Sequence, residues 1–124
     1  MANPNIVNVA SIYANTKGMT VTSSVQDLIA ATETSTGKVV KLNSIIISNV
    51  DGSNNDSITV NWYDASAVVT YPIVKEVVVI AKSTLVVLGK DAPIYLNEGD
   101  KITVQGVAAS GDLVAIASYE TLSE

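Results

Sequence analysis

Oxygen-bearing side chains gather in one short stretch of this sequence, where they could bind a cation. Asp51, Ser53, Asn55 and Asp56 offer carboxylate, hydroxyl and amide oxygens, which are the ligands that Ca²⁺ prefers. A calcium loop of the EF-hand type needs Gly at its sixth position and Glu at its twelfth, whereas Asp56 and Trp62 stand there. A polar loop is the better interpretation, and we predict no metal site and no cofactor.

Catalysis by the remaining acids or serines is also disfavoured. Two carboxyl groups could hydrolyse glycosidic bonds, but one Trp, five Tyr and no Phe leave few rings to line a sugar cleft. The acids stand mainly in turns: Asp51, Asp56, Asp91, Glu98, Asp100 and Asp112. The chain has no His and no Cys, its seven basic residues are all lysines, and no G-x-S-x-G motif surrounds a serine. We therefore predict that the protein is not an enzyme.

The charge and polarity of the chain favour contact with other proteins. Twelve acids against seven lysines give a net charge of −5, which repels nucleic acids and anionic membranes. Only 15% of residues are charged, and the polar residues are mostly Ser (13), Thr (11) and Asn (10). Such a surface loses little hydration energy on contact, although the codon bias of an AT-rich genome accounts for it equally well. No signal peptide or membrane-spanning segment is visible, so we expect a soluble protein.

The elements that must position these residues are strands. Val (19), Ile (12) and Thr (11) dominate the composition, and turn signals recur about every ten residues. This pattern predicts an all-β fold: a single antiparallel β-sandwich, jelly-roll-like, with eight or nine strands. We expect residues 1–20 to be an extended arm or first strand and residues 21–124 to be the sandwich. The clearest strands are predicted at 38–49, 57–64, 70–80, 84–88, 94–96, 101–107 and 113–120.

Side-chain alternation predicts which face each strand buries. Within 38–49, the pattern groups Ile46 with Val40 and Leu42 on one side. The segment 70–80 is apolar on both sides, which predicts a strand covered on both faces. The loop 51–56 is expected to close a hairpin between its two neighbouring strands. Near the N-terminus we expect an extended segment over 6–14 and a turn at 17–18, whereas 24–31 fits either a short strand or a single turn.

Two local patterns predict particular contacts. In the stretch LNEGDKITV, Gly99 should adopt positive φ and the Asp100 carboxylate should accept backbone N–H groups, which makes this turn structural. On the strand 57–64, Trp62 should enter the core with Ile58 and Val60, while its neighbour Tyr63 faces outward.

Apolar side chains outside the predicted core are candidates for an interface. The first residues of the chain are weakly patterned and could lie on a neighbouring subunit, and outward-facing tyrosines could anchor a contact. The candidate interface residues are Ile6, Val7, Val9, Ile12, Tyr13, Tyr63 and Tyr71.

Five segments, in this order and over nearly the whole chain, resemble a family of small virion structural proteins of marine tailed bacteriophages, including cyanophages. The segments read MANPNIVNV, GKVVKLNSIIISNVDGSN, SITVNWYDAS, STLVVLGKDAPIYLNEGDKITV and LVAIASYETLSE. Each alone is ordinary strand-and-turn sequence, and only their succession is distinctive. The resemblance implies a particle component of β-sandwich type, with no catalytic residues to carry over.

Among particle components, a capsid decoration or cement protein fits best. Such a protein would bind the major capsid protein or other virion proteins over subunit contacts, as a homo-oligomer and preferably a trimer. Its expected place is the outer capsid surface, after synthesis in the host cytoplasm. A neck, tail or fibre component is the first alternative. A glycan-binding β-sandwich, with Tyr63, Tyr71 and Tyr95 as its candidate rings, is the second.

Overall fold

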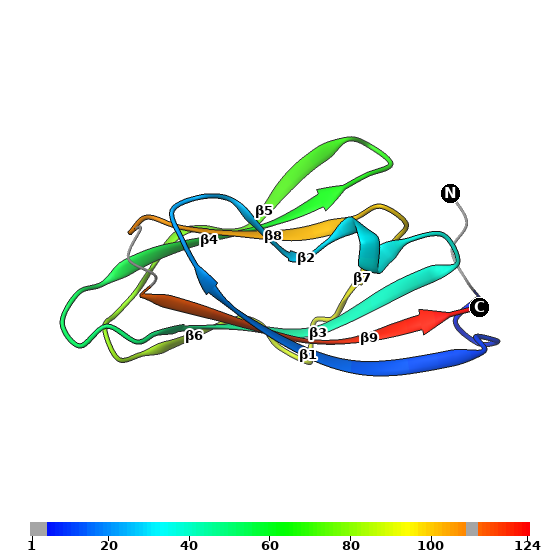
Figure 1. Ribbon diagram of the computed structural model, residues 1–124, viewed down its shortest axis with the longest axis horizontal. Helices are drawn as coiled ribbons and strands as arrows, with labels where there is room; N and C mark the ends of the chain where they lie inside the picture. Colours follow the sequence, from blue (N-terminus) through cyan, green and yellow to red (C-terminus); the bar gives the residue numbers. More distant parts are fainter. Residues whose placement is uncertain (1–4, 109–111) are drawn as a thin grey trace.

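Two antiparallel β-sheets pack face to face in the computed structural model of the protein, which describes residues 5–108 and 112–124 (Figure 1). Sheet A has the order β1-β9-β3-β6, with β7 also paired to β3, and sheet B has the order β2-β8-β4-β5. The strands are β1 (Ser11–Val21), β2 (Gln26–Ile29), β3 (Lys38–Asn49), β4 (Asp56–Asp64), β5 (Val69–Val79), β6 (Thr84–Leu88), β7 (Ile94–Leu96), β8 (Lys101–Gly106) and β9 (Leu113–Ser123). One 3-10 helix, η1, spans Ala31–Thr34. The predicted all-β, two-sheet architecture is confirmed, because nine strands form in the described residues.

The chain crosses repeatedly from one sheet to the other, which gives the jelly-roll topology. The connections β1–β2, β3–β4 and β5–β6 all cross at the same end of the sandwich, on the left in Figure 1. The loop that follows β3 is one of them. The prediction that residues 51–56 close a hairpin was therefore wrong, since β3 belongs to sheet A and β4 to sheet B.

Strand β3 supplies much of the core and has the predicted bounds. Its register with β9 shifts between Leu42 and Ser44, so the inward side changes along the strand. As a result Ile45 and Ile47 are fully buried, and Ile46 faces away from the core. The predicted grouping of Ile46 with Val40 and Leu42 was wrong for this reason, because a bulge leaves no signal in the hydrophobic pattern.

Strand β5 is an edge strand of sheet B and is not covered on both faces. Tyr71 and Val78 are 47% and 56% exposed. The register of β5 with β4 shifts on either side of Val60. Glu76 takes a left-handed backbone conformation with φ 51°, and its N–H donates to Thr59 Oγ1 at 3.0 Å. Some apolar residues of β5 therefore pack against the core, and others lie at the surface.

The N-terminal part of the described chain forms one long strand. Strand β1 begins at Ser11 and continues through Lys17 and Gly18, so the predicted turn at 17–18 was wrong. The extended segment predicted over 6–14 forms only from Ser11 onward, because residues 6–10 belong to no strand. All of β1 pairs with β9 in an unbroken register. Before it, the chain turns at Asn5, whose side-chain oxygen accepts the N–H of Val7 at 3.0 Å.

The ambiguous stretch 24–31 contains β2, and the helix η1 follows it. The Glu33 carboxylate accepts the N–H of Ala30 at 3.1 Å and lies 3.5 Å from Lys17 Nζ of strand β1. The Tyr119 hydroxyl of strand β9 also donates to Glu33. One carboxylate thereby holds η1 against sheet A.

Replacing Tyr119 with Phe tests this contact. Burial, reinforced by Glu33, raises the pKa of Tyr119 above its ordinary value of 10.0, so its neutral form stabilises the fold. The variant should lose about 1.5–3 kcal/mol of unfolding free energy at neutral pH, measured by urea denaturation. The wild type should also lose stability as pH rises from about 10 to 12, because unfolded Tyr119 ionises first, and the variant should lose less. Tyr95→Phe, at an exposed position, is the control; equal losses in both variants would contradict the assignment.

Candidate binding surfaces

The turn between β7 and β8 has the structural role predicted for it. Gly99 has φ 83°, and a Cβ at this position would come within 3.0 Å of the Ala65 side chain, so glycine is needed for both backbone and space. The Asp100 carboxylate accepts the N–H of Asn97 at 3.0 Å and of Ala65 at 2.9 Å. Asp100, at 1% exposure, therefore ties the β7–β8 turn to the β4–β5 hairpin.

Trp62 belongs to the same cluster. Its ring is half-buried against the core and stacks on Tyr71, with 5.5 Å between centroids and 22° between planes. Its Nε1–H donates to Asp100 at 3.4 Å. The prediction that Trp62 turns inward is confirmed. Tyr63, on the opposite side of β4, has Lys101 Nζ 5.3 Å from its ring centroid.

The carboxylates of the loop after β3 are engaged by backbone donors. Asp51 Oδ1 accepts the N–H groups of Ser53 at 2.7 Å and Asn54 at 2.9 Å, and these bonds lower the pKa of Asp51. Asp56 is buried, and it accepts N–H groups from its own strand and from the chain after β8. Within residues 5–108 and 112–124, no three acids converge in a way that could hold a metal ion. The arrangement is that of a loop capped by its own side chains.

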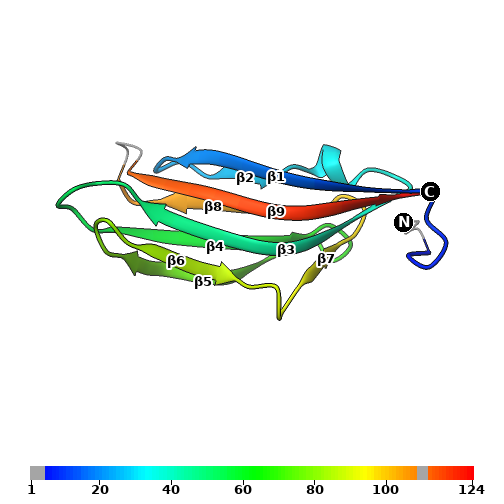
Figure 2. The same ribbon diagram turned by 90° about the horizontal axis from the view of Figure 1, so that it is seen from below.

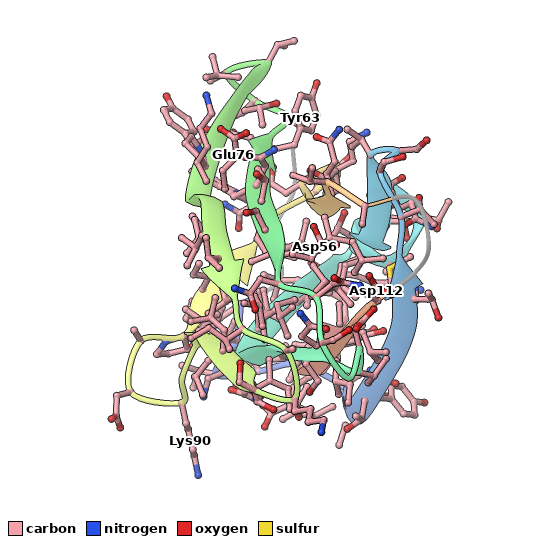
Figure 3. All side chains as sticks on the ribbon, turned by 90° about the vertical axis from the view of Figure 1, so that its left-hand side faces the viewer. Asp56, Tyr63, Glu76, Lys90 and Asp112 are labelled. Carbon is pink, nitrogen blue, oxygen red and sulfur yellow. The ribbon has the colours of Figure 1, made fainter. Side chains whose placement is uncertain are left out.

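A hollow of about 400 Å³ lies on the outer face of sheet B. It is lined by Thr59, Asn61, Pro72, Lys75, Glu76, Gln105, Gly106 and Val107. The bulge in β5 helps shape it, since the displaced residues Lys75 and Glu76 form one wall. Figure 3 shows Glu76 and Tyr63 on this side of the molecule, both on the β4–β5 hairpin.

Apart from the wall formed by Lys75 and Glu76, the polar side chains of the hollow are neutral hydrogen-bonding groups. Thr59 Oγ1 is occupied by Glu76 N–H, and Gln105 Nε2 donates to Ser23 O at 2.9 Å. Nothing in the described part of the chain hydrogen-bonds the Asn61 side chain, which leaves its amide available to a ligand. Sequence alternation could place Thr59 and Asn61 on one face, but Gln105 joins them only through the pairing of β8 with β4.

The predicted interface residues occupy two separate regions. Ile6, Val7 and Val9 precede β1, while Ile12 and Tyr13 lie at its start. Val7 is 85% exposed, and Ile12 and Tyr13 are exposed by more than half. Tyr63 and Tyr71 lie on the β4–β5 hairpin of sheet B, where both already contact neighbouring side chains. The structure does not bring these two groups into one surface.

Comparison with solved structures supports the fold. The chain is similar to a subunit of the disulfide-linked pili of Bacillus endospore appendages, with TM-score 0.53, 14% identity, and 91% and 87% of the two chains covered. It is also similar to the Drosophila NLP core, described for pentamer formation and histone binding, with TM-score 0.51, 18% identity, and coverage of 86% and 95%. A chain of the virus-like particle of the extra small virus of the giant freshwater prawn Macrobrachium rosenbergii gives TM-score 0.48 at 12% identity, with coverage of 94% and 82%.

No protein-family model matches the chain, and no curated protein matches it. At these identities the structural likeness defines a fold class, the jelly roll. No helix in the described residues is long and apolar enough to cross a membrane.

The Asp100 cluster yields a second prediction. Asp100→Ala would leave two backbone N–H groups and the Trp62 indole N–H without their acceptor in a buried site. We expect a loss of about 3 kcal/mol or more in unfolding free energy, measured by chemical denaturation. Asp91→Ala, in an exposed loop, should change stability by less than about 0.5 kcal/mol. A loss below about 1 kcal/mol for Asp100→Ala would show that this cluster is dispensable.

Proposed function

We propose that the protein is a non-enzymatic structural component of a phage virion, and specifically a capsid decoration protein on the outer capsid surface. In this role it binds the major capsid protein across subunit contacts and stabilises the DNA-filled head. The observation that carries the proposal is the set of large apolar side chains that the sandwich leaves exposed. They lie in separate regions, which include the segment before and at the start of edge strand β1 and the edge strand β5.

The edge strands suit attachment to other subunits. Strand β1 pairs with β9 without a bulge, has no proline, and carries one charged residue, Lys17. Its outer edge therefore has few of the features that prevent strand addition. Apolar side chains before and at the start of β1 could add side-chain contacts to such pairing. With many copies per particle, modest contacts at each site sum to a strong clamp.

The acids of the described chain support a non-enzymatic role. Asp51, Asp56, Asp64 and Asp100 each accept backbone N–H bonds that shape loops or turns. The carboxylates most distinctive in the sequence thus stabilise the fold, which leaves them poorly placed as acids or bases.

The resemblance to small phage virion proteins supports the same role. The fold is compatible with assembly too, since the two neighbours above TM-score 0.5 are described as a pilus component and as a pentamer-forming core. We propose that this chain also forms a homo-oligomer. The sequence favours a trimer, whereas the outer face of sheet A, described below, favours a two-fold dimer.

The copy number per virion tests the proposal. Quantitative mass spectrometry of purified particles should find hundreds of copies, on the order of one per major capsid subunit. Copies in the range of a few to a few tens would identify a neck, tail or fibre component. Absence from purified particles would overturn the virion role altogether.

Glycan binding is a second candidate function, because the hollow on sheet B exposes the free amide of Asn61. Screening the protein on an array of neutral glycans should detect binding that Asn61→Leu reduces about tenfold or more, since a buried amide contact is lost. Asn54→Leu, in the exposed loop after β3, is the matched control. An array without signal, or a signal equal in both variants, would remove this candidate.

A further inference from the structure

The outer face of sheet A contains an apolar row that crosses the whole sheet. The pairing registers place Gly18 of β1 beside Ile116 of β9, Ile116 beside Ile46 of β3, and Ile46 beside Val86 of β6. Figure 2 views the sandwich from this side, with β1, β9, β3 and β6 in succession. The four residues therefore lie side by side on one face.

These aliphatic side chains do not serve the core of their own chain. Ile46, Ile116 and Val114 are partly exposed, and none of them belongs to the buried cluster or packs against it. Val86 is 62% exposed. The outer face of an antiparallel sheet in water is normally polar, so this exposed apolar row indicates a surface that another molecule covers.

The rows on either side of the apolar row carry no charge. One contains Thr20, Val114, Ser48 and Thr84, and the other contains Thr16, Ser118 and Ser44. The Ser48 and Thr84 hydroxyls hydrogen-bond each other at 3.2 Å, which lowers the cost of removing water from them. In a chain of net charge −5, this is a neutral surface with an apolar centre and a hydroxyl rim.

We propose that this face pairs with the same face of a second copy of the chain, about a two-fold axis parallel to the strands between β9 and β3. Rotation about that axis places β9 of one copy over β3 of the other, and β1 over β6 and β7. Each Ile116 then meets the second copy's Ile46, and the sheets pack in the aligned arrangement usual for sandwiches. Such a contact is isologous, because each residue pair occurs twice.

Side-chain sizes across the face are complementary under this rotation. Gly18 of one copy lies opposite Val86 of the other, and Ala14 lies opposite Tyr95, so small residues meet exposed large ones. Gly18 has no need to be glycine within its own chain. Its φ is not positive, and an added Cβ would meet only ordinary contacts at 3.8 Å. A close approach by the second copy at this position would explain why the residue is a glycine.

The charges at the edge of the neutral region are also complementary. Glu120 of β9 pairs with Lys41 of β3, and the rotation exchanges their positions. Each Glu120 therefore faces a Lys41 of the other copy. In the next row, Val39 and Leu122 are already buried, and the segment before β1 lies at that end of the sandwich (Figure 1). The contact thus has a defined boundary.

The size of the face predicts a weak dimer. Four strands about 4.8 Å apart and about seven residues of 3.3 Å rise give a projected area of about 440 Å² per copy. The total of about 900 Å² lies just below the roughly 1,000 Å² that stable specific interfaces exceed, which places it among weak interfaces. Self-association is therefore expected in the micromolar range, which corresponds to about 10⁻⁶–10⁻⁴ M.

Sedimentation equilibrium of the full chain over a wide concentration range tests the proposal. The wild type should show a monomer–dimer equilibrium. Val86→Glu should raise its dissociation constant about tenfold or more, because a carboxylate would enter an apolar contact. Val25→Glu is the matched control, since Val25 has a similar exposure of 59% in the β1–β2 loop and should leave the equilibrium unchanged.

Charge exchange provides an independent test of the axis. Glu120→Lys alone would bring lysines of the two copies together, as Lys41→Glu alone would bring acids together, and each should weaken the dimer. The double variant should restore wild-type association. Circular dichroism should show an unchanged strand signal in all variants, because these side chains face outward.

Three results would overturn the inference: a monomer at all concentrations, a dimer that none of these variants weakens, or a trimer. A closed trimer requires each subunit to present two different surfaces, one to each neighbour, whereas a two-fold contact closes after two copies. A monomer would leave the neutral face to a different protein. None of these results bears on the copy number in the virion, so this inference and the proposed function can fail separately.

Discussion

Sheet A depends on the insertion of its last strand, β9, between β1 and β3. β9 pairs with both neighbours over nearly its whole length, so two strands from the first half of the chain are joined only by its C-terminal segment. The alternation of β9 then defines both sides of the sheet. Leu113, Ala115 and Ala117 enter the core, while Val114 and Ile116 reach the outer face. Strand β9 thereby joins β1 to β3 and contributes residues both to the core and to the neutral outer face of sheet A.

The parts of the fold that follow from local chemistry could be predicted from sequence. Strand β3 has the predicted bounds because turn residues flank a segment rich in Val and Ile, and the β7–β8 turn follows from the need for glycine at positive φ. The outward side of Ile46 and the edge position of β5 could not be predicted. Both depend on bulges and on the partner each strand finds far along the chain, and neither leaves a periodic signal.

The candidate surfaces likewise divide into those that local sequence predicts and those that depend on long-range strand pairing. Sequence reasoning identified exposed apolar residues near the N-terminus, since weak patterning there leaves no inward face to bury them. It missed the hollow on sheet B, because Asn61 and Gln105 meet only through the pairing of β4 with β8. The outer face of sheet A was missed for a related reason. Its row takes one residue from each of four strands. In β9, β3 and β6 that residue reads as part of a buried run, whereas Gly18 of β1 was predicted to lie in a turn.

The distribution of charge reconciles an acidic chain with assembly. A net charge of −5 makes identical copies repel at long range, but at physiological salt this repulsion is screened beyond about 8 Å. Short-range contacts therefore decide where copies meet. Acids such as Asp51 and Asp100 lie in loops and turns, whereas the middle of the outer face of sheet A carries none. Repulsion between acids then disfavours contact through the loops. The neutral sheet face remains the surface at which two copies approach with the smallest electrostatic cost, so repulsion elsewhere contributes to specificity.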